Sequence, residues 1–266
     1  MTDIQRKYEV KFYRRIRTIL DAEVEKVVSV LKSEGIIAAQ SYVSKILSIE
    51  ELPKIVEQMY VEIGGRFARK TWIDLNNQRR AKGFGFNAKW VEWIKDFLYR
   101  YLIDKITFEV AQTTKSILLQ TLQQAFQEGW GINETVKNLR DLPFKKYQAA
   151  RIARTEGTRA ANAGIYAAGQ TFPFQQTKEW IAAHDKRTRG QEKKPHASHV
   201  LLDRQVIDFE DYFVDPINGD KLLFPGDPQG SAASVINCRC VIALMAKRDE
   251  NGKLIPKVNE WQLQLR

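Results

Sequence analysis

The residues best suited to chemistry lie in one stretch of the chain, which runs from Arg151 to Cys240. All three histidines and both cysteines are found there: His184, His196, His199, Cys238 and Cys240. Imidazole nitrogens and thiolates are ligands that zinc accepts, and a cysteine beside a histidine can also serve as an activated nucleophile. This stretch is therefore where a site is expected.

One interpretation of these residues is a zinc site formed by His199, Cys238 and Cys240, with His184 or His196 as the fourth ligand. Paired zinc-binding cysteines are commonly separated by about two to four residues. Here a single residue separates Cys238 from Cys240, and the chain has no second cysteine pair. The other interpretation is that the cysteines are small buried strand residues and that the histidines make hydrogen bonds. A structural zinc is thus an open alternative, and no other cofactor is expected.

A second group of candidates is the tripeptide Arg154-Thr155-Glu156. On a helix, Glu156 would lie one turn from Arg159 and could pair with it. The tripeptide predicts either charges that hold the helix against a β unit or a catalytic glutamate. An arginine, a hydroxyl residue and a glutamate also occur in ADP-ribosyltransferase sites, which makes such an enzyme the alternative function. Those enzymes need a Glu-x-Glu or Gln-x-Glu late in the chain, and only a poor match at residues 208–211 is present, so the structural role is favoured.

Sequence motifs of common hydrolases and nucleotide-binding enzymes are missing. The chain has no Gly-x-Ser-x-Gly, no His-Glu-x-x-His and no P-loop. A nucleophile and base formed by Cys238 and His199 would depend on spatial proximity, which the sequence does not show. We therefore expect a protein that is not an enzyme.

The balance of charges favours an anionic partner. The chain of 266 residues has 42 Lys and Arg against 32 Asp and Glu, a net charge of +10. Positive charge is densest between residues 66 and 95, where Phe84, Phe86 and Trp90 interleave with it. Basic side chains neutralise phosphates irrespective of sequence, and aromatic rings can stack on bases. The residues expected to contact DNA are Arg66, Arg69, Lys70, Arg79, Arg80, Lys82 and Lys89. The alternative is a solvated helix face beside a core of tryptophans.

The spacing of the cysteines and the hydropathy of the chain indicate a cytosolic protein that is neither secreted nor inserted in a membrane. On one strand, Cys238 and Cys240 would point in the same direction, so a disulfide between them would be strained. Reduced thiols and a reducing cytosol are therefore expected. The N-terminal residues lack the apolar run of a secretory signal, and the longest uncharged window, residues 160–177, is too polar to span a bilayer. We expect no membrane partner.

The candidate residues must be positioned by the helices and strands around them. Apolar residues recur at helical spacing through the first two thirds of the chain. The pattern predicts helices over residues 4–33, 37–47, 48–77, 88–128, 133–141 and 144–169. A kink is expected at Gly64-Gly65 and a break near Thr113-Thr114. After Pro173, short apolar runs alternate with turn residues. They predict strands over residues 177–183, 200–202, 205–209, 221–224 and 235–246.

These elements predict an α+β protein: a long helix-rich N-terminal part, then a compact, loop-rich α+β C-terminal domain with a small, mainly antiparallel sheet. Three regions are expected: 1–130, 131–246 and a polar tail, 247–266, anchored by Trp261. The helix at 144–169 is rich in Ala and Gly. Because small residues permit close helix packing, we expect it to be buried against a neighbour.

The polar residues also form a longer ordered pattern: Arg154-Thr-Glu156, Trp180, Asp185, Arg187, Arg189, His199, Leu202-Asp203, Gln205, Gly219, Pro225 and Asn237-Cys-Arg-Cys240. In order and spacing this pattern resembles the head-morphogenesis, or minor head protein, family of tailed phages, which is named after the F protein of phage Mu. The resemblance covers roughly residues 130–245. Two departures occur: Arg204 occupies a turn position where the family often has glycine, and the segment between Arg189 and His199 carries extra residues, including His196.

The resemblance implies a virion protein of the capsid interior, made in the host bacterial cytoplasm and present in few copies. It implies association with the portal, a requirement for assembly or for correct DNA delivery, and no established enzyme activity. We expect the basic face to make non-specific contact with double-stranded DNA and another surface to hold the chain to the portal protein or the major capsid protein. The helical region 1–130 is assigned by elimination to contacts with portal, capsid and DNA. A DNA-binding protein of host origin is a further alternative, which salt-dependent binding by the helical region would favour.

Within the family-like region we expect a structural polar core that locks the 144–169 helix onto the small sheet. Buried charges are tolerated only when they are paired, so we expect the loss of Glu156 to destabilise this region. The expected members of the core are Arg151, Arg154, Thr155, Glu156, Trp180, Asp185, Arg187, His199, Asp203, Asn237, Cys238, Arg239 and Cys240.

Overall fold

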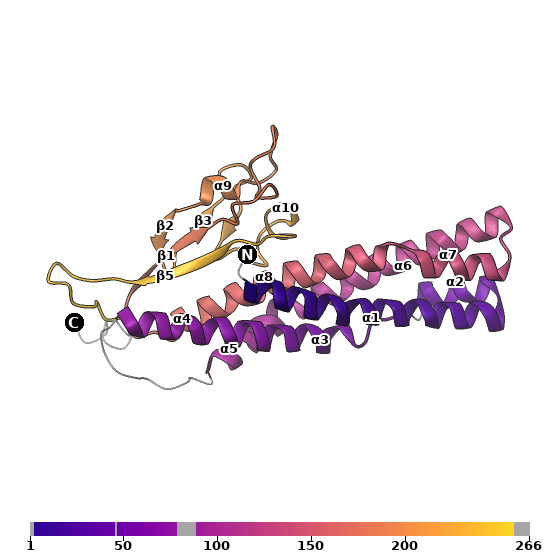
Figure 1. The fold of residues 1–266 in the computed structure, drawn as a ribbon, viewed down its shortest axis with the longest axis horizontal. Coiled ribbons are helices and arrows are strands. Elements are labelled where there is room, and N and C mark those ends of the chain that lie inside the picture. Colours follow the sequence, from indigo (N-terminus) through magenta and orange to yellow (C-terminus); the bar gives the residue numbers. More distant parts are fainter. Residues whose placement is uncertain (1–2, 46, 79–88, 258–266) are drawn as a thin grey trace. The chain divides into compact units, whose positions relative to one another are not determined.

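The computed structural model describes residues 3–45, 47–78 and 89–257. Helices make up most of the chain as far as Thr171, and small antiparallel sheets follow, which confirms the predicted α+β class (Figure 1). The chain divides into two compact units that are built from separate stretches of sequence. Unit 1 contains Met1–Gln5, Met59–Phe97 and Arg154–Arg266, and unit 2 contains Arg6–Gln58 and Leu98–Ala153. The boundaries expected after residues 130 and 246 concern consecutive regions and stay a prediction.

Eight long or medium helices and one π-helical turn precede the first strand in the described residues. They are α1 (Asp3–Glu34), α2 (Ile36–Lys45), α3 (Leu52–Met59), the π turn η1 (Tyr60–Gly64), α4 (Gly65–Gln78), α5 (Lys89–Tyr101), α6 (Ile103–Glu128), α7 (Ile132–Asp141) and α8 (Phe144–Thr171). No helix in the described ranges combines the length and the low charge needed to cross a membrane.

Unit 2 is a helical body whose core follows the apolar spacing seen in the sequence. Phe12, Ile16 and Leu20 are fully buried on α1, one turn apart. Polar contacts fasten its helices together: the Arg140 guanidinium on α7 donates two hydrogen bonds to Glu25 on α1, at 2.8 and 2.7 Å. These spacings explain why the helices were predicted well from local pattern alone.

Two details of the helices differ from the sequence prediction. The expected break near Thr113-Thr114 is absent, because both hydroxyls bond to carbonyls one turn earlier and α6 continues through them. The break lies at Leu102, whose backbone leaves the helical region between α5 and α6 (φ −133°, ψ −40°). The expected kink at Gly64-Gly65 takes the form of the π turn that ends at Gly64.

The sheets of unit 1 are small and antiparallel. The strands are β1 (Gln176–Ile181), β2 (Val206–Asp208), β3 (Phe213–Val214), β4 (Lys221–Leu222) and β5 (Val241–Ala246). β1 lies between β2 and β5 (Figure 1). β3 pairs with β4 in a separate two-stranded ribbon. In the β1–β5 pair, Lys178 lies opposite Leu244 and Trp180 lies opposite Ile242.

Two predictions in this part of the chain were wrong. Residues 200–202, expected as a strand, belong to the short helix α9 (His199–Leu202). The strand expected over 235–246 begins only at Val241, because residues 232–235 form the helix α10 (Ala232–Val235) and Asn237 turns the chain with φ +59°. The expected polar tail is partly structured: Gln175 bonds to Ile255 and Lys257 bonds to Pro173, both through backbone groups. Trp261 lies outside the described residues.

The side chain of Lys178 on β1 is fully buried, which is unusual for a lysine. Its Nζ lies 5.4 to 5.8 Å from the ring centres of Tyr166, Phe209 and Phe213 and has no hydrogen-bond partner among the described residues. Burial lowers the pKa of Lys178 from 10.5 to about 8, although nearby carboxylates such as Glu210 oppose this shift. The rings compensate the charge only in part.

We predict that Lys178→Met stabilises the chain at pH 7 by about 1 to 3 kcal/mol, because it removes a buried ammonium that lacks a hydrogen-bond partner. Below about pH 8 the lysine is protonated in the folded and the unfolded chain, and the penalty is complete. Between about pH 8 and 10.5 the folded chain has released this proton while the unfolded chain still binds it, so wild-type stability rises relative to the variant. Urea denaturation of both chains from pH 7 to 10 measures the difference.

The matched control is Lys221→Met on the exposed position of β4. This substitution is expected to change the free energy of unfolding by less than about 0.5 kcal/mol at every pH. If the Lys178→Met difference stays constant from pH 7 to 10, the ammonium is solvated and the prediction is wrong.

Candidate functional site

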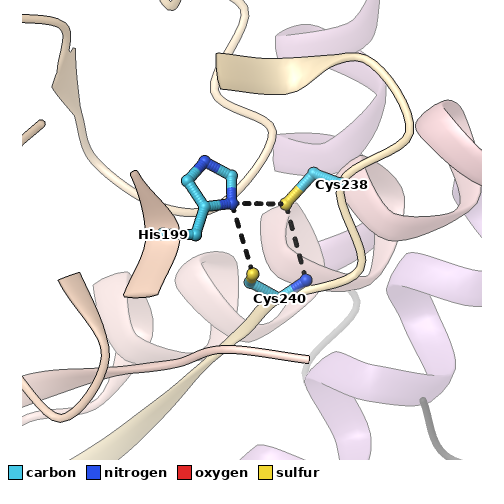
Figure 2. Close-up of side chains that lie close together, drawn as sticks. All are labelled: His199, Cys238 and Cys240. Atoms are coloured by element: carbon cyan, nitrogen blue, oxygen red, sulfur yellow. Dashed lines mark hydrogen bonds between the residues drawn. The ribbon is translucent and has the colours of Figure 1, made fainter. Parts of the chain in front are cut away.

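One histidine and both cysteines meet in the interior of unit 1. The Nδ1 atom of His199 lies 3.5 Å from Sγ of Cys238 and 3.4 Å from Sγ of Cys240. Figure 2 shows both sulfurs on the same side of the imidazole ring, which they face through Nδ1. The three residues are 1 to 2% exposed. Of the sequence-predicted candidates, these three therefore form the cluster with potential chemistry, and both cysteines are free thiols.

His199 is positioned by the cap of its short helix. The Ser198 hydroxyl accepts a hydrogen bond from the Leu201 N–H, which makes Ser198 the N-cap of α9. The N–H of Ser198 donates to a carboxylate oxygen of the fully buried Asp215 at 2.8 Å. Trp180 meets the imidazole edge-on, with ring centres 5.0 Å apart. Local capping and a distant carboxylate thus set the direction in which His199 points.

The cysteines are positioned from helix α8. The Thr155 hydroxyl accepts the N–H of Asn237, and the Asn237 side chain accepts a hydrogen bond from Arg154. Asn162 also bridges α8 to the start of β5: its amide N–H donates to the Cys240 carbonyl, and its oxygen accepts the Ile242 N–H, both at 3.0 Å. These bonds place Cys238 and Cys240 at a turn that leads into β5.

The two thiols share a strongly asymmetric environment. The hydrogen bond with Cys240, together with the neighbouring His199, holds the pKa of Cys238 well below its usual value although burial opposes this. The hydrogen bond with Cys238 and burial raise the pKa of Cys240. The two pKa values are thus shifted in opposite directions because the thiols share one hydrogen bond.

A salt bridge closes the loop beside the cysteines. Arg239 is buried and donates two hydrogen bonds to Asp185, at 3.1 and 2.5 Å. Burial raises the pKa of Asp185, but the backbone N–H of Arg187 and the guanidinium of Arg239 outweigh it and leave the pKa lowered. Asp203 accepts the N–H of Ala182 at 2.7 Å. Asp185 and Arg239 thus form one polar contact and Asp203 a separate one, and their assignment to a structural polar core stays a prediction.

Several expected residues do not join this cluster. The side chains of Arg151 and Arg187 are exposed, so they are not members of a buried polar core, and Arg187 contributes only its backbone N–H. His184 is exposed and its Nε2 lies 3.3 Å from Asp203. His196 is also exposed. Neither histidine is grouped with His199 and the cysteines, so neither is the fourth ligand that the sequence suggested.

Glu156 forms a second buried cluster. Its carboxylate accepts hydrogen bonds from Arg159 at 2.8 and 2.9 Å and from the Tyr60 hydroxyl at 2.8 Å. Burial raises the pKa of Tyr60 well above its usual value, so the hydroxyl stays a donor. Arg159 also donates to the carbonyl of Gly226. Both carboxylate oxygens are engaged and the residue is 5% exposed, an environment that suits a structural ion pair and not a catalytic glutamate.

The basic segment is only partly described. Arg66, Arg69 and Lys70 are exposed on α4, where Lys70 pairs with Asp74 at 2.8 Å, and Lys89 is exposed at the start of α5. Arg79, Arg80 and Lys82 lie outside the described residues.

The aromatic residues near these charges belong to the core. Trp90 is fully buried against Trp72, with ring centres 5.4 Å apart. Phe84 and Phe86 lie outside the described residues. Base stacking by Trp90 is therefore not supported.

Sequence reasoning missed three residues that organise the site. Asn162 on α8 makes four hydrogen bonds, Asp215 holds the α9 cap, and Tyr60 completes the Glu156 cluster. One indication of Asn162 was present in the sequence: an asparagine within a run of alanines is poorly suited to a helix interior unless its side-chain amide makes hydrogen bonds. Asp215 and Tyr60 gave none, because their partners are distant in sequence.

The expected turn after α9 forms with Arg204 in the place of glycine. Arg204 has φ +66°, a conformation that favours glycine, and its N–H donates to the Trp180 carbonyl at 2.8 Å. Its guanidinium pairs with Glu179 at 2.9 Å. The departure from the family pattern therefore leaves the turn itself intact.

Comparison with known proteins gives one family. Residues 116–243 match the family model described as Phage Mu protein F like protein. A relative in Bacillus subtilis (strain 168), Uncharacterized protein YqbB, is 27% identical over 154 residues. That alignment covers 58% of this chain and 47% of the relative, so this chain spans about half of the relative's length. No solved structure has significant similarity to the chain. The matched range includes His199, both cysteines, Glu156 and Arg159, whereas Tyr60 lies outside it.

Proposed function

Since this chain carries a domain of the Phage Mu protein F-like family over residues 116–243, we propose that it is a minor head protein that acts in the head morphogenesis of a tailed bacteriophage. The family match is the observation that carries this proposal. The chain would be made in the bacterial cytoplasm and incorporated in the capsid interior, in contact with the portal protein or the major capsid protein.

The state of the polar residues supports a structural role for the domain. Glu156 and Arg159 pair with each other, and Asp185 pairs with Arg239. These charges are used to hold α8 and the loops of unit 1 together. A protein of this kind contributes by its shape and its surface, and we propose that it is not an enzyme.

Incorporation in the particle is the direct test of this function. Heads assembled in a host that expresses the complete set of head genes are purified, and their proteins are identified by mass spectrometry. We expect this chain to co-purify with heads that contain portal protein, and we expect misassembled or DNA-poor heads when its gene is deleted. Heads that assemble and package DNA normally without the chain would contradict the proposal.

We also propose a non-specific contact with double-stranded DNA through the exposed basic side chains of α4. Arg66 and Arg69 are exposed one turn apart in sequence, and the chain carries a net charge of +10. Each phosphate contact adds about one unit to the slope of log affinity against log salt concentration. DNA binding would keep the protein next to the packaged genome.

We predict that replacing Arg66 and Arg69 together by glutamate weakens DNA binding at low salt by about tenfold or more and lowers the salt slope by about two units. Fluorescence anisotropy with a DNA duplex of arbitrary sequence, at several salt concentrations, measures both. The control is Lys146→Glu, an exposed position in the first turn of α8, where a negative charge is favourable. An unchanged slope in the double variant would exclude α4 as the contact.

A further inference from the structure

We propose that His199, Cys238 and Cys240 bind one zinc ion and that this ion fastens α9 to the turn before β5. The inference is independent of the proposed role in the phage head, because it concerns how unit 1 is held together.

The two nitrogen–sulfur separations match a tetrahedral zinc site. Zinc bonds of about 2.3 Å to sulfur and about 2.0 Å to nitrogen, at tetrahedral angles, place the nitrogen and each sulfur about 3.5 Å apart. The observed distances from His199 Nδ1 are 3.5 Å to Cys238 and 3.4 Å to Cys240. All three ligand atoms lie within 4.8 Å of one another. One ion can therefore reach all of them without a change in the backbone.

Hydrogen bonds alone account poorly for the arrangement. Nδ1 of an imidazole offers either one lone pair or one N–H, yet both sulfurs approach it (Figure 2). The Cys238 sulfur also accepts the N–H of Cys240 at 3.4 Å. A metal satisfies the nitrogen lone pair and both sulfurs at one point. The imidazole proton then lies on Nε2, which faces away from the sulfurs in Figure 2.

Charge and ligand type favour zinc over the other common divalent ions. Two thiolates neutralise the ion, and a neutral imidazole adds no charge, so the complete site is neutral in a region where an isolated charge would be costly. Two sulfurs and one nitrogen do not suit calcium or magnesium, which prefer oxygen ligands. The described residues supply three ligand side chains, all of them buried.

The position of the site in the fold explains what the ion would do. His199 precedes the cysteines by 39 and 41 residues, and the chain between them contains only the short elements β2, β3, β4 and α10. Elements of two to four residues bury little apolar surface and give a loop of this length little stability of their own. A zinc ion that joins the two ends of this loop would restrict the unfolded chain and hold the loop closed in the folded one, as in other small metal-stabilised domains.

The test measures zinc in the full chain, purified under reducing conditions from cells grown with added zinc. We expect about one ion per chain in wild type and less than about 0.2 in Cys238→Ser and in His199→Gln. The matched controls His196→Ala and His184→Ala remove the other two histidines and are expected to keep the ion. Loss of zinc in these controls, or its absence from wild type, would overturn the proposal.

Two measurements on wild type keep the test valid if the ligand variants fail to fold. Cobalt(II) added to the metal-free reduced chain should give the intense charge-transfer absorption of thiolate coordination and visible bands of tetrahedral geometry. Both thiols should resist alkylation until a strong chelator is added. Absent cobalt bands, thiols that react equally fast with and without chelator, or a chain two mass units light from a Cys238–Cys240 disulfide would each contradict zinc binding.

Discussion

Replacing Glu156 by alanine is expected to lower the free energy of unfolding by about 3 to 5 kcal/mol, because it leaves a buried arginine without its partner. Burial disfavours the charge of Arg159, but the Glu156 carboxylate and the Tyr60 hydroxyl outweigh this and raise the pKa of Arg159. An arginine side chain stays protonated even without its partner, so the guanidinium is still charged in the variant, where it retains its bond to the Gly226 carbonyl. Urea denaturation of the full chain measures the loss.

Two further variants separate the ion pair from the rest of the cluster. Tyr60→Phe removes one hydrogen bond to the carboxylate and is expected to cost about 1.5 to 3 kcal/mol. The matched control is Glu51→Ala, which breaks the exposed, solvent-screened pair with Lys54 and is expected to cost far less than Glu156→Ala. If Glu156→Ala costs no more than Glu51→Ala, the buried cluster is not a source of stability and the structural role given to Glu156 is wrong.

Gly164→Ala is expected to destabilise the chain by more than about 3 kcal/mol or to prevent folding, because α8 touches the π turn at this glycine. A Cβ atom at residue 164 would overlap the carbonyl oxygen of Gly64 and lie 2.7 Å from its Cα. The obstacle is backbone, which cannot rotate aside as a flexible side chain can. Helix α8 and the π turn would have to separate.

Gly157→Ala, two turns earlier on the same helix, is the matched control. Its Cβ would meet only the Ile63 side chain, at 3.8 Å, which is ordinary van der Waals contact. Alanine is the better helix former, so this variant is expected to gain about 0.5 to 1 kcal/mol. Relative to wild type, the melting temperature and the urea midpoint should therefore fall in Gly164→Ala and rise in Gly157→Ala. Equal effects at both positions would show that close packing at Gly164 does not constrain the helix.

Features held by residues close together in the sequence could be predicted, and features held by residues far apart in the sequence could not. The helices of unit 2 and the pair of Glu156 with Arg159 rest on residues three or four positions apart, which a local pattern shows directly. The strand expected at 200–202 was wrong because a short apolar run fits a strand or a helix equally well. The cap at Ser198 and the distant carboxylate of Asp215 select the helix. The lysine enclosed by three rings had no local signal at all.

From its residues alone, this chain could be assigned an α+β fold, a helix-rich first part and a resemblance to the Phage Mu protein F-like family, which the match over residues 116–243 supports, because order, spacing and hydropathy are properties of the sequence. Tertiary structure alone decided that neither His184 nor His196 joins His199 and the cysteines, because the α9 cap carries only His199 to them. It also decided that Tyr60 reaches Glu156 across 96 residues. Contacts between residues so far apart depend on how the elements pack, and no local pattern encodes that packing.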